Sequence, residues 1–197
     1  MKEYPVKSVS EPIDWDSVEE AVLSECSWSP YSSPKATAQA VFLPGKGIVI
    51  RLKSCTAPAR AENYEPDSPV WEDSCLEFFF SNGGEKYVNL EANANAAMRA
   101  SIGTDRHNRT LLLNALCTMP QVSTMEDSES WQVFFFIPCA TYSELFGEEL
   151  QSGCIVKGNF YSCGDKTPLT HYSAWNTVET AAPDFHRPEF FGSLILE

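Results

Sequence analysis

The fold is decided by the stretch SCLEFFF at residues 74–80, which is followed by SNGG at 81–84 and by KYVNLEA at 86–92. Aromatic and β-branched residues favour strands because they fit a half-buried, pleated surface. The small, polar and glycine-rich tetrapeptide between the two runs indicates a turn. The sequence therefore predicts two consecutive strands joined by a turn, with Glu77 surrounded by apolar neighbours.

Further strands are predicted on both sides of this pair, each bounded by turn residues. Pro44-Gly45-Lys46 is a typical hairpin connection between two of them, whereas residues 1–12 are expected to be an extended lead-in. The additional strands cover residues 36–43, 47–53, 96–102, 121–125, 131–137, 155–161 and 191–196. Short helices are predicted at 16–20 and 140–146, the second ended by Gly147. We expect a single domain, residues 1–197, that is all-β: a two-sheet, jelly-roll-like antiparallel β-sandwich with one or two short helices.

The composition excludes some classes of partner. The formal net charge is −13, and no run of basic residues is present. An acidic protein repels phosphate backbones and anionic lipids, so we expect neither a nucleic-acid partner nor a membrane partner. We expect the protein to be a monomer.

Seven cysteines occur, and no two of them have CxxC spacing. An odd count without that spacing is atypical of a disulfide framework or of a zinc site. Free thiols in this number indicate a reducing compartment, and no signal peptide is visible. We therefore expect a cytoplasmic protein, or a secreted or periplasmic one if the N-terminus has been trimmed.

Side chains alternate between the two faces of a strand, so each predicted strand presents one apolar and one polar set. The expected core set is Leu76, Phe78, Phe80, Val88, Leu90, Met98 and Val156. The polar set is Glu77, Asn89, Glu91, Arg99 and Asn159. Such a face is solvated in an ordinary antiparallel sheet. Asn, Glu and Arg also make multi-point hydrogen bonds to hydroxyl groups, so the alternative is a face that binds a polyol.

Two segments carry a resemblance to a known family. PVWEDSCLEFFF at residues 69–80, with YVNLEAN at 87–93, resembles a strand pair of family 9 carbohydrate-binding modules. PDFHRPEFFG at 183–192, together with Trp175 and Asn176, looks like the closing segment of a bacterial branch of that family. The opening IDWD at 13–16 is loosely similar to the family's N-terminal motif. Together these matches span roughly residues 13–196.

The resemblance implies a β-sandwich that binds sugars between two tryptophans, with no catalytic residues and a place in bacterial polysaccharide catabolism. Trp71 and Trp175 match the tryptophan pair, and Glu77 and Arg99 match the groups beside the sugar hydroxyls. The predicted carbohydrate-binding residues are Trp71, Glu77, Asn89, Glu91, Arg99, Asn159, Trp175 and Asn176. The alternative for either tryptophan is that it anchors a loop to the core.

Two other functions stay open at this point. Glu77 and Glu91 are carboxylates that a glycosidase could use as a pair. A haem-binding sandwich could use Met98 with His107 or His171, although a polar face disfavours the apolar slot that haem needs.

The segment 183–189 holds Asp184, His186, Arg187 and Glu189. An enzyme could use His186 as a general base oriented by Asp184. The prolines that bracket the segment favour a rigid latch in which Arg187 binds carboxylates.

We predict no cofactor and assign no metal ligand among the site residues. A polar loop could nevertheless hold calcium through carboxylate and carbonyl oxygens, although it lacks an EF-hand pattern. Its candidate ligands are Glu62, Asn63, Glu65 and Asp67.

Overall fold

The computed structural model describes residues 1–28 and 33–197, and almost every regular element in it is a β-strand. The strands are β1 (Glu3–Ser8), β2 (Ala21–Val22), β3 (Ala36–Leu43), β4 (Gly47–Ser54), β5 (Cys75–Ser81), β6 (Tyr87–Asn93), β7 (Met98–Gly103), β8 (Arg109–Leu111), β9 (Gln121–Glu126), β10 (Trp131–Pro138), β11 (Ile155–Gly164), β12 (His171–Ala174) and β13 (Gly192–Leu196). The one α-helix is α1 (Cys139–Phe146), and short 3-10 turns are η1 (Trp15–Ser17), η2 (Val70–Glu72), η3 (Leu112–Asn114) and η4 (Pro188–Phe190). The all-β prediction is confirmed.

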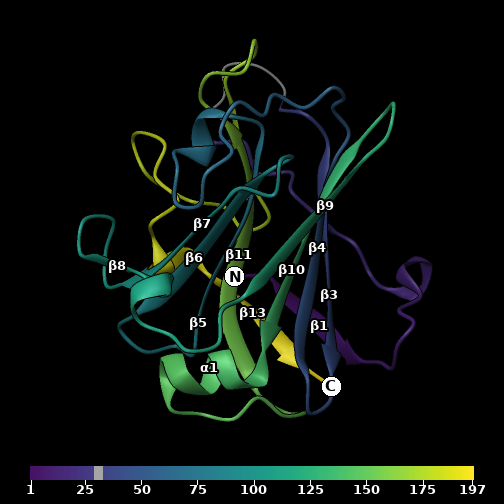
Figure 1. Ribbon diagram of the computed structural model, residues 1–197, viewed down its shortest axis with the longest axis vertical. Coiled ribbons are helices and arrows are strands. Elements are labelled where there is room, and N and C mark those ends of the chain that lie inside the picture. Colours follow the sequence, from purple (N-terminus) through teal and green to yellow (C-terminus); the bar gives the residue numbers. More distant parts are fainter. Residues whose placement is uncertain (29–32) are drawn as a thin grey trace.

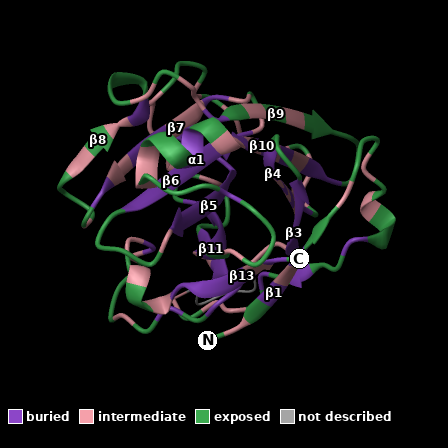
Figure 2. Ribbon diagram, turned by 90° about the horizontal axis from the view of Figure 1, so that it is seen from below, coloured by how far each residue is buried: buried purple, intermediate pink, exposed green. Residues whose placement is uncertain are grey.

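The strands form two layers that are joined along one edge (Figure 1). The continuous order is β8-β7-β6-β5-β11-β13-β1-β3-β4-β10-β9, with β12 paired to β11 and β2 to β3. Strand β1 makes the join, because residues 3–6 pair with β13 and residues 7–8 pair with β3. Both of these pairings are parallel, whereas every other ladder is antiparallel. The sheet therefore curls around its interior as a sandwich closed on one side (Figure 2).

The interior between the layers holds the residues that alternation predicts. Leu76, Phe78, Phe80, Val88, Leu90 and Val156 are at most 1% exposed, and Met98 packs against them half-buried. The rings of Phe78, Phe80 and Phe160 are stacked with centroids 5.1–5.2 Å apart. Burying each such ring stabilises the fold by about 1.5–3 kcal/mol.

The opposite face of β5 and β6 is also buried, which the expectation of a solvated outer face did not foresee. Every residue of both strands is buried, including Glu77 at 2% and Asn89 at 1% exposed. The cover is a second cluster of aromatic and small side chains from the loops and from the chain after β12. Polar groups on this face therefore lie under protein, where a hydrogen bond or a charge partner is needed.

The local elements differ from expectation in two ways. The helix predicted at 16–20 is only the 3-10 turn at residues 15–17, because Val18 is already extended. Strands β1, β8 and β12 were not predicted as strands, although β1 lies in the segment expected to be an extended lead-in. Helix α1 ends as predicted at Gly147, whose φ of 70° is the left-handed conformation that glycine favours. Within the described residues, no helix is both long enough and apolar enough to cross a membrane.

Candidate functional site

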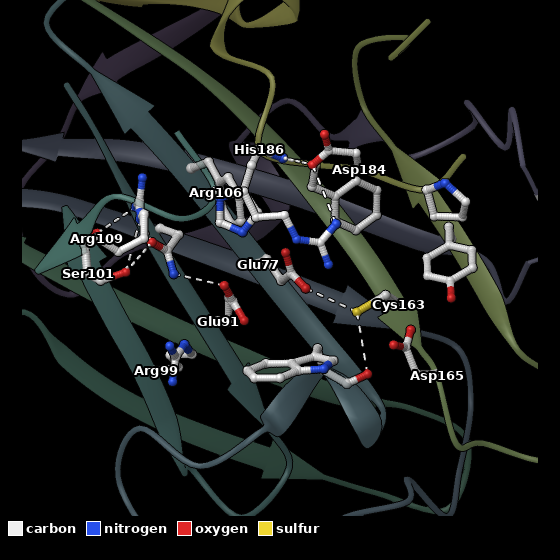
Figure 3. A pocket seen from close by; sticks show the side chains of 16 residues that line it. Glu77, Glu91, Arg99, Ser101, Arg106, Arg109, Cys163, Asp165, Asp184 and His186 are labelled. Atoms are coloured by element: carbon white, nitrogen blue, oxygen red, sulfur yellow. Dashed lines mark hydrogen bonds and ion pairs between the residues drawn. The ribbon is translucent and has the colours of Figure 1, made fainter. Parts of the chain in front are cut away.

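A pocket of about 390 Å³ opens on the covered face of β5, β6, β7 and β11, and we call it the outer pocket (Figure 3). Its lining is unusually rich in charged groups for a site that also holds several aromatic rings. The lining residues are Trp71, Glu77, Phe79, Asn89, Glu91, Arg99, Ser101, Arg106, Arg109, Cys163, Asp165, Tyr172, Pro183, Asp184, Phe185 and His186.

The register of three strands places the polar floor of this pocket. Glu77 of β5 lies directly opposite Glu91 of β6, and Glu91 lies opposite Arg99 of β7. The next row along the strands joins Asn89 with Ser101. Directly opposite residues on one face have Cβ atoms about 4.5–5.5 Å apart, so each row is a line of neighbouring side chains. Five residues that lie far apart in the sequence therefore share one surface.

The two floor glutamates are held in an environment that favours protonation. Burial and the facing Glu91 carboxylate raise the pKa of Glu77 well above its ordinary value. Burial also raises the pKa of Glu91, to about 7, although Arg99 and a hydrogen bond from Asn89 oppose the shift. Asn89 Nδ2 donates that bond to Glu91 Oε1 over 2.8 Å. Near neutral pH this pair therefore offers both a carboxylic acid donor and a carboxylate acceptor to a ligand.

Arg109 forms the corner of the pocket beyond this pair. Its guanidinium lies 4.2 Å from the ring centroid of Tyr87 and donates to Ser101 O over 2.9 Å and to Asn89 Oδ1. Its Nη1 atom is buried and makes no hydrogen bond to any described residue. An unpaired buried donor is costly, so this atom is suited to an acceptor on a bound molecule.

Trp71 lies at the rim of the pocket on the 3-10 turn η2. Its carbonyl accepts from the backbone of Asp165 over 3.1 Å, and the neighbouring Glu72 binds Lys166 over 2.8 Å. The Arg99 guanidinium lies 5.3 Å from the Trp71 ring centroid, within the range of a cation–π contact. Tyr172, from β12, lines the same pocket. The site thus has two half-buried aromatic side chains, and η2 is bonded to the turn that connects β11 with β12.

The segment 183–189 covers one side of the pocket. Arg187 Nε binds Asp184 Oδ2 over 2.7 Å, as the latch interpretation expects. His186 Nδ1 is 2.9 Å from the Tyr87 hydroxyl, and burial together with Arg109 lowers the pKa of His186 to about 3. Asp184 accepts the backbone N–H of His186 rather than a bond from its ring. The imidazole is therefore neutral and is held by Tyr87, which is not the arrangement of a base oriented by Asp184.

Three predicted site residues lie outside the pocket. Trp175 is 4% exposed and packs edge-on against Tyr4 at 6.3 Å, so it anchors its loop to the core and does not face Trp71. Asn159 is fully buried and binds the backbone of Asn176 through both its amide atoms, at 2.9 and 3.0 Å. The predictions for Trp175, Asn159 and Asn176 as pocket residues are corrected accordingly: all three are buried, and the residue of β11 that lines the pocket is Cys163.

The loop proposed for calcium is organised by Asp73. This buried carboxylate accepts bonds at 2.9–3.0 Å from Asn63, Asn93 and the Glu62 backbone. Burial alone would raise the pKa of Asp73, but these hydrogen bonds hold the pKa below its ordinary value. Glu62 itself pairs with Arg60. The hydrogen bonds that order this loop thus come from the chain itself.

The residues named for haem are scattered. Met98 packs against the core and His107 is exposed. His171 lines a second pocket of about 450 Å³, which neither of them reaches.

The predicted carbohydrate-binding residues leave out several residues that line the pocket, most of them in loops or short strands. They are Ser101, Arg106, Arg109, Cys163, Asp165, Tyr172, Asp184, Phe185 and His186. Of these, Ser101 and Cys163 could have been found by extending the alternation of β7 and β11. The others depend on loop paths, for which periodicity carries no signal.

Comparison with known proteins agrees with this fold. A search of curated proteins finds no match. A Bacteroides uniformis protein to which carbohydrate binding has been ascribed is 27% identical, with a TM-score of 0.82 over 100% of this chain and 99% of that one. Family 9 modules of Caldicellulosiruptor kristjanssonii in complex with cellotriose and with glucose share 12% and 13% identity. Their TM-scores are 0.71 and 0.72, over 100% of this chain and 94% and 96% of theirs. The sequence profile of carbohydrate-binding family 9 matches residues 7–196, and the chain therefore belongs to that family.

Proposed function

We propose that the protein binds a saccharide non-catalytically in the outer pocket. The observation that carries the proposal is the combination of an aromatic rim with a buried row of hydrogen-bonding groups, Glu77, Glu91 and Arg99, directly opposite one another. Pyranose rings have apolar C–H faces and hydroxyl edges, which such a combination matches. Membership of family 9 and the sugar complexes of its structural relatives support the same ligand class.

In the proposed complex the sugar stacks on Trp71, and Tyr172 provides the second aromatic side chain. Tyr172 lies three residues before Trp175 in the sequence and lines the pocket, where Trp175 had been expected. The hydroxyl edge turns toward the floor, where Glu91 accepts a hydrogen bond and Arg109 Nη1 donates one. The pocket volume of about 390 Å³ lies at the small end of ligand sites, which span roughly 300–1,000 Å³. A mono- or disaccharide unit, such as the end of a chain, therefore suits it best.

Affinity is expected to be modest. A single aromatic stack contributes on the order of 1 kcal/mol beyond its area burial, so we expect a dissociation constant between roughly micromolar and millimolar.

Calorimetric titration with a panel of mono- and oligosaccharides tests this proposal. Trp71→Ala should reduce affinity for any binding sugar at least about tenfold, because the lost stack is worth about 1.4 kcal/mol or more with its buried area. Trp15→Ala is a matched control, since Trp15 is also half-buried beneath an arginine, Arg51 at 5.6 Å, but belongs to the other layer. Loss of binding in both variants, or in neither, would contradict the site.

The glycosidase alternative rests on the same Glu77–Glu91 pair, because two coupled buried carboxylates with raised pKa are also found in acid–base catalysis. Incubating each binding oligosaccharide with the protein and analysing the products separates the two functions. Recovery of intact ligand is the expected outcome. Hydrolysis that Glu91→Gln abolishes would replace the binding proposal with an enzymatic one.

A further inference from the structure

Two cysteines and a glutamate meet beneath the outer pocket. Cys75 of β5 lies directly opposite Cys163 of β11, and Glu77 follows two residues after Cys75 on the same face. The sulfur atoms of both cysteines and a carboxylate oxygen of Glu77 lie within 4.8 Å of one another. Cys163 Sγ is 3.0 Å from Glu77 Oε1 (Figure 3). The three residues are at most 3% exposed.

This arrangement is close to what a tetrahedral ion requires. With Zn–S bonds of about 2.3 Å, two sulfurs bound to one tetrahedral ion lie about 3.8 Å apart, and small side-chain movements reach that distance from the present one. The ligands come from two paired strands, whose backbone holds the three Cβ atoms in place. Two thiols with one carboxylate favour a borderline or soft divalent ion such as Zn²⁺ over calcium or magnesium.

The charge around the cluster also favours a cation. Among the described residues, neither Glu77 nor Glu91 forms a salt bridge. Glu77 lies directly opposite Glu91 on β6 and Tyr161 on β11, so the residues that face it across both paired strands carry no positive charge. A buried carboxylate without a positive partner is costly, and a divalent cation beside it removes that cost.

We propose that Cys75, Glu77 and Cys163 bind a thiophilic divalent cation of the Zn²⁺ type at the base of the outer pocket. A molecule from the pocket would provide the fourth ligand, because Glu77 and Cys163 both line the pocket. On binding, each thiol releases its proton to the solvent, a protonated Glu77 does the same, and no oxidation occurs. The site is separate from the aromatic contacts of the proposed function, although Glu77 belongs to both.

Cobalt is the probe of choice, because tetrahedral Co²⁺ bound to thiolates absorbs both in the near ultraviolet, by sulfur-to-metal charge transfer, and strongly in the visible. The full chain, kept reduced with a non-thiol reductant, is titrated with Co²⁺. Both absorption bands should appear and saturate at one Co²⁺ per chain, and added Zn²⁺ should displace the Co²⁺. Cys163→Ser should weaken Co²⁺ binding at least tenfold and remove the charge-transfer band. Cys55→Ser and Cys117→Ser alter exposed cysteines and should change neither the Co²⁺ affinity nor the charge-transfer band.

Circular dichroism of each variant verifies that it is folded. If Cys163→Ser does not fold, Cys75→Ser tests the same loss of Co²⁺ binding independently. Weak bands of octahedral Co²⁺, or bands that survive in a folded Cys163→Ser or Cys75→Ser variant, would overturn the proposal. A Cys75–Cys163 disulfide that persists under the reductant would overturn it as well. Trp71→Ala should keep the cobalt bands while losing saccharide binding, so failure of the metal site and failure of the sugar site are distinguishable.

Discussion

At the scale of single residues, the buried pair Glu77–Glu91 makes stability depend on pH. The folded-state pKa of Glu91, about 7, lies above its ordinary value of 4.5, so the folded protein binds more protons than the unfolded chain between these limits. The contribution of protonated Glu91 to the free energy of unfolding is therefore fully present below about pH 4.5 and is lost as the pH rises through 7. Glu77 shifts in the same direction.

Glu91→Gln should remove part of this dependence. We expect the wild type to lose up to about 1.4 kcal/mol of unfolding free energy per pH unit from this group, and the variant to lose less. Urea unfolding at several pH values between 5 and 8 measures the difference. Glu85→Gln, at an exposed glutamate, is the control, and parallel pH profiles for wild type and Glu91→Gln would contradict the assignment.

The burial of Trp175 gives a second prediction at this scale. A Cβ atom at Gly192 would lie 2.5 Å from the Trp175 ring and 2.8 Å from the Lys2 carbonyl. Gly192→Ala should therefore destabilise the fold by about 1–3 kcal/mol through overpacking. Gly84→Ala serves as comparison, because its Cβ would meet only the half-buried side chain of Asn82, with Oδ1 at 3.1 Å. Equal denaturation midpoints for the two variants would show that Trp175 is not held as described.

At the scale of elements, β1 joins the two layers. Its first half pairs with β13 and its second half with β3, and Tyr4 and Val6 are at most 2% exposed. Removing residues 1–8 exposes both neighbouring strand edges and the core behind them. We expect the shortened chain to lose its cooperative thermal transition, as followed by near-ultraviolet circular dichroism. A transition within a few degrees of the wild type would mean that the two layers hold together without β1.

Alternation predicts the strands that are long and regularly patterned, such as β5 and β6, and with them Glu77, Asn89, Glu91 and Arg99 in the pocket. It fails for β1, where Pro5 interrupts the pattern, and for β12, which has only four residues. Strand β1 depends on β13, far away in the sequence, whereas β12 pairs with the preceding strand β11 but is too short to show a period. Trp175 was misplaced for the same reason, because a tryptophan in a polar loop has no periodic neighbours that show which way it points.

At the scale of the whole molecule, charge and surface composition determine association. The large exposed apolar side chains, such as Tyr64 and Met125, are scattered, and the net charge is −13. Scattered apolar groups on a strongly acidic surface disfavour self-association. Light scattering after size exclusion should therefore give a mass near 21.9 kDa at physiological salt. A mass of twice that value would show that a second copy covers one of these surfaces.

The join made by β1 has a consequence for synthesis of the protein in the cell. Residues 3–6 are synthesised about 190 residues ahead of their partners, residues 193–196. Contacts of such sequence separation form late, because a long loop must close first. During translation the layer β3-β4-β10-β9 is complete while β13 is still missing, so β1 cannot yet join the two layers. We therefore expect the nascent chain to need chaperones that protect hydrophobic surface until β13 has been synthesised.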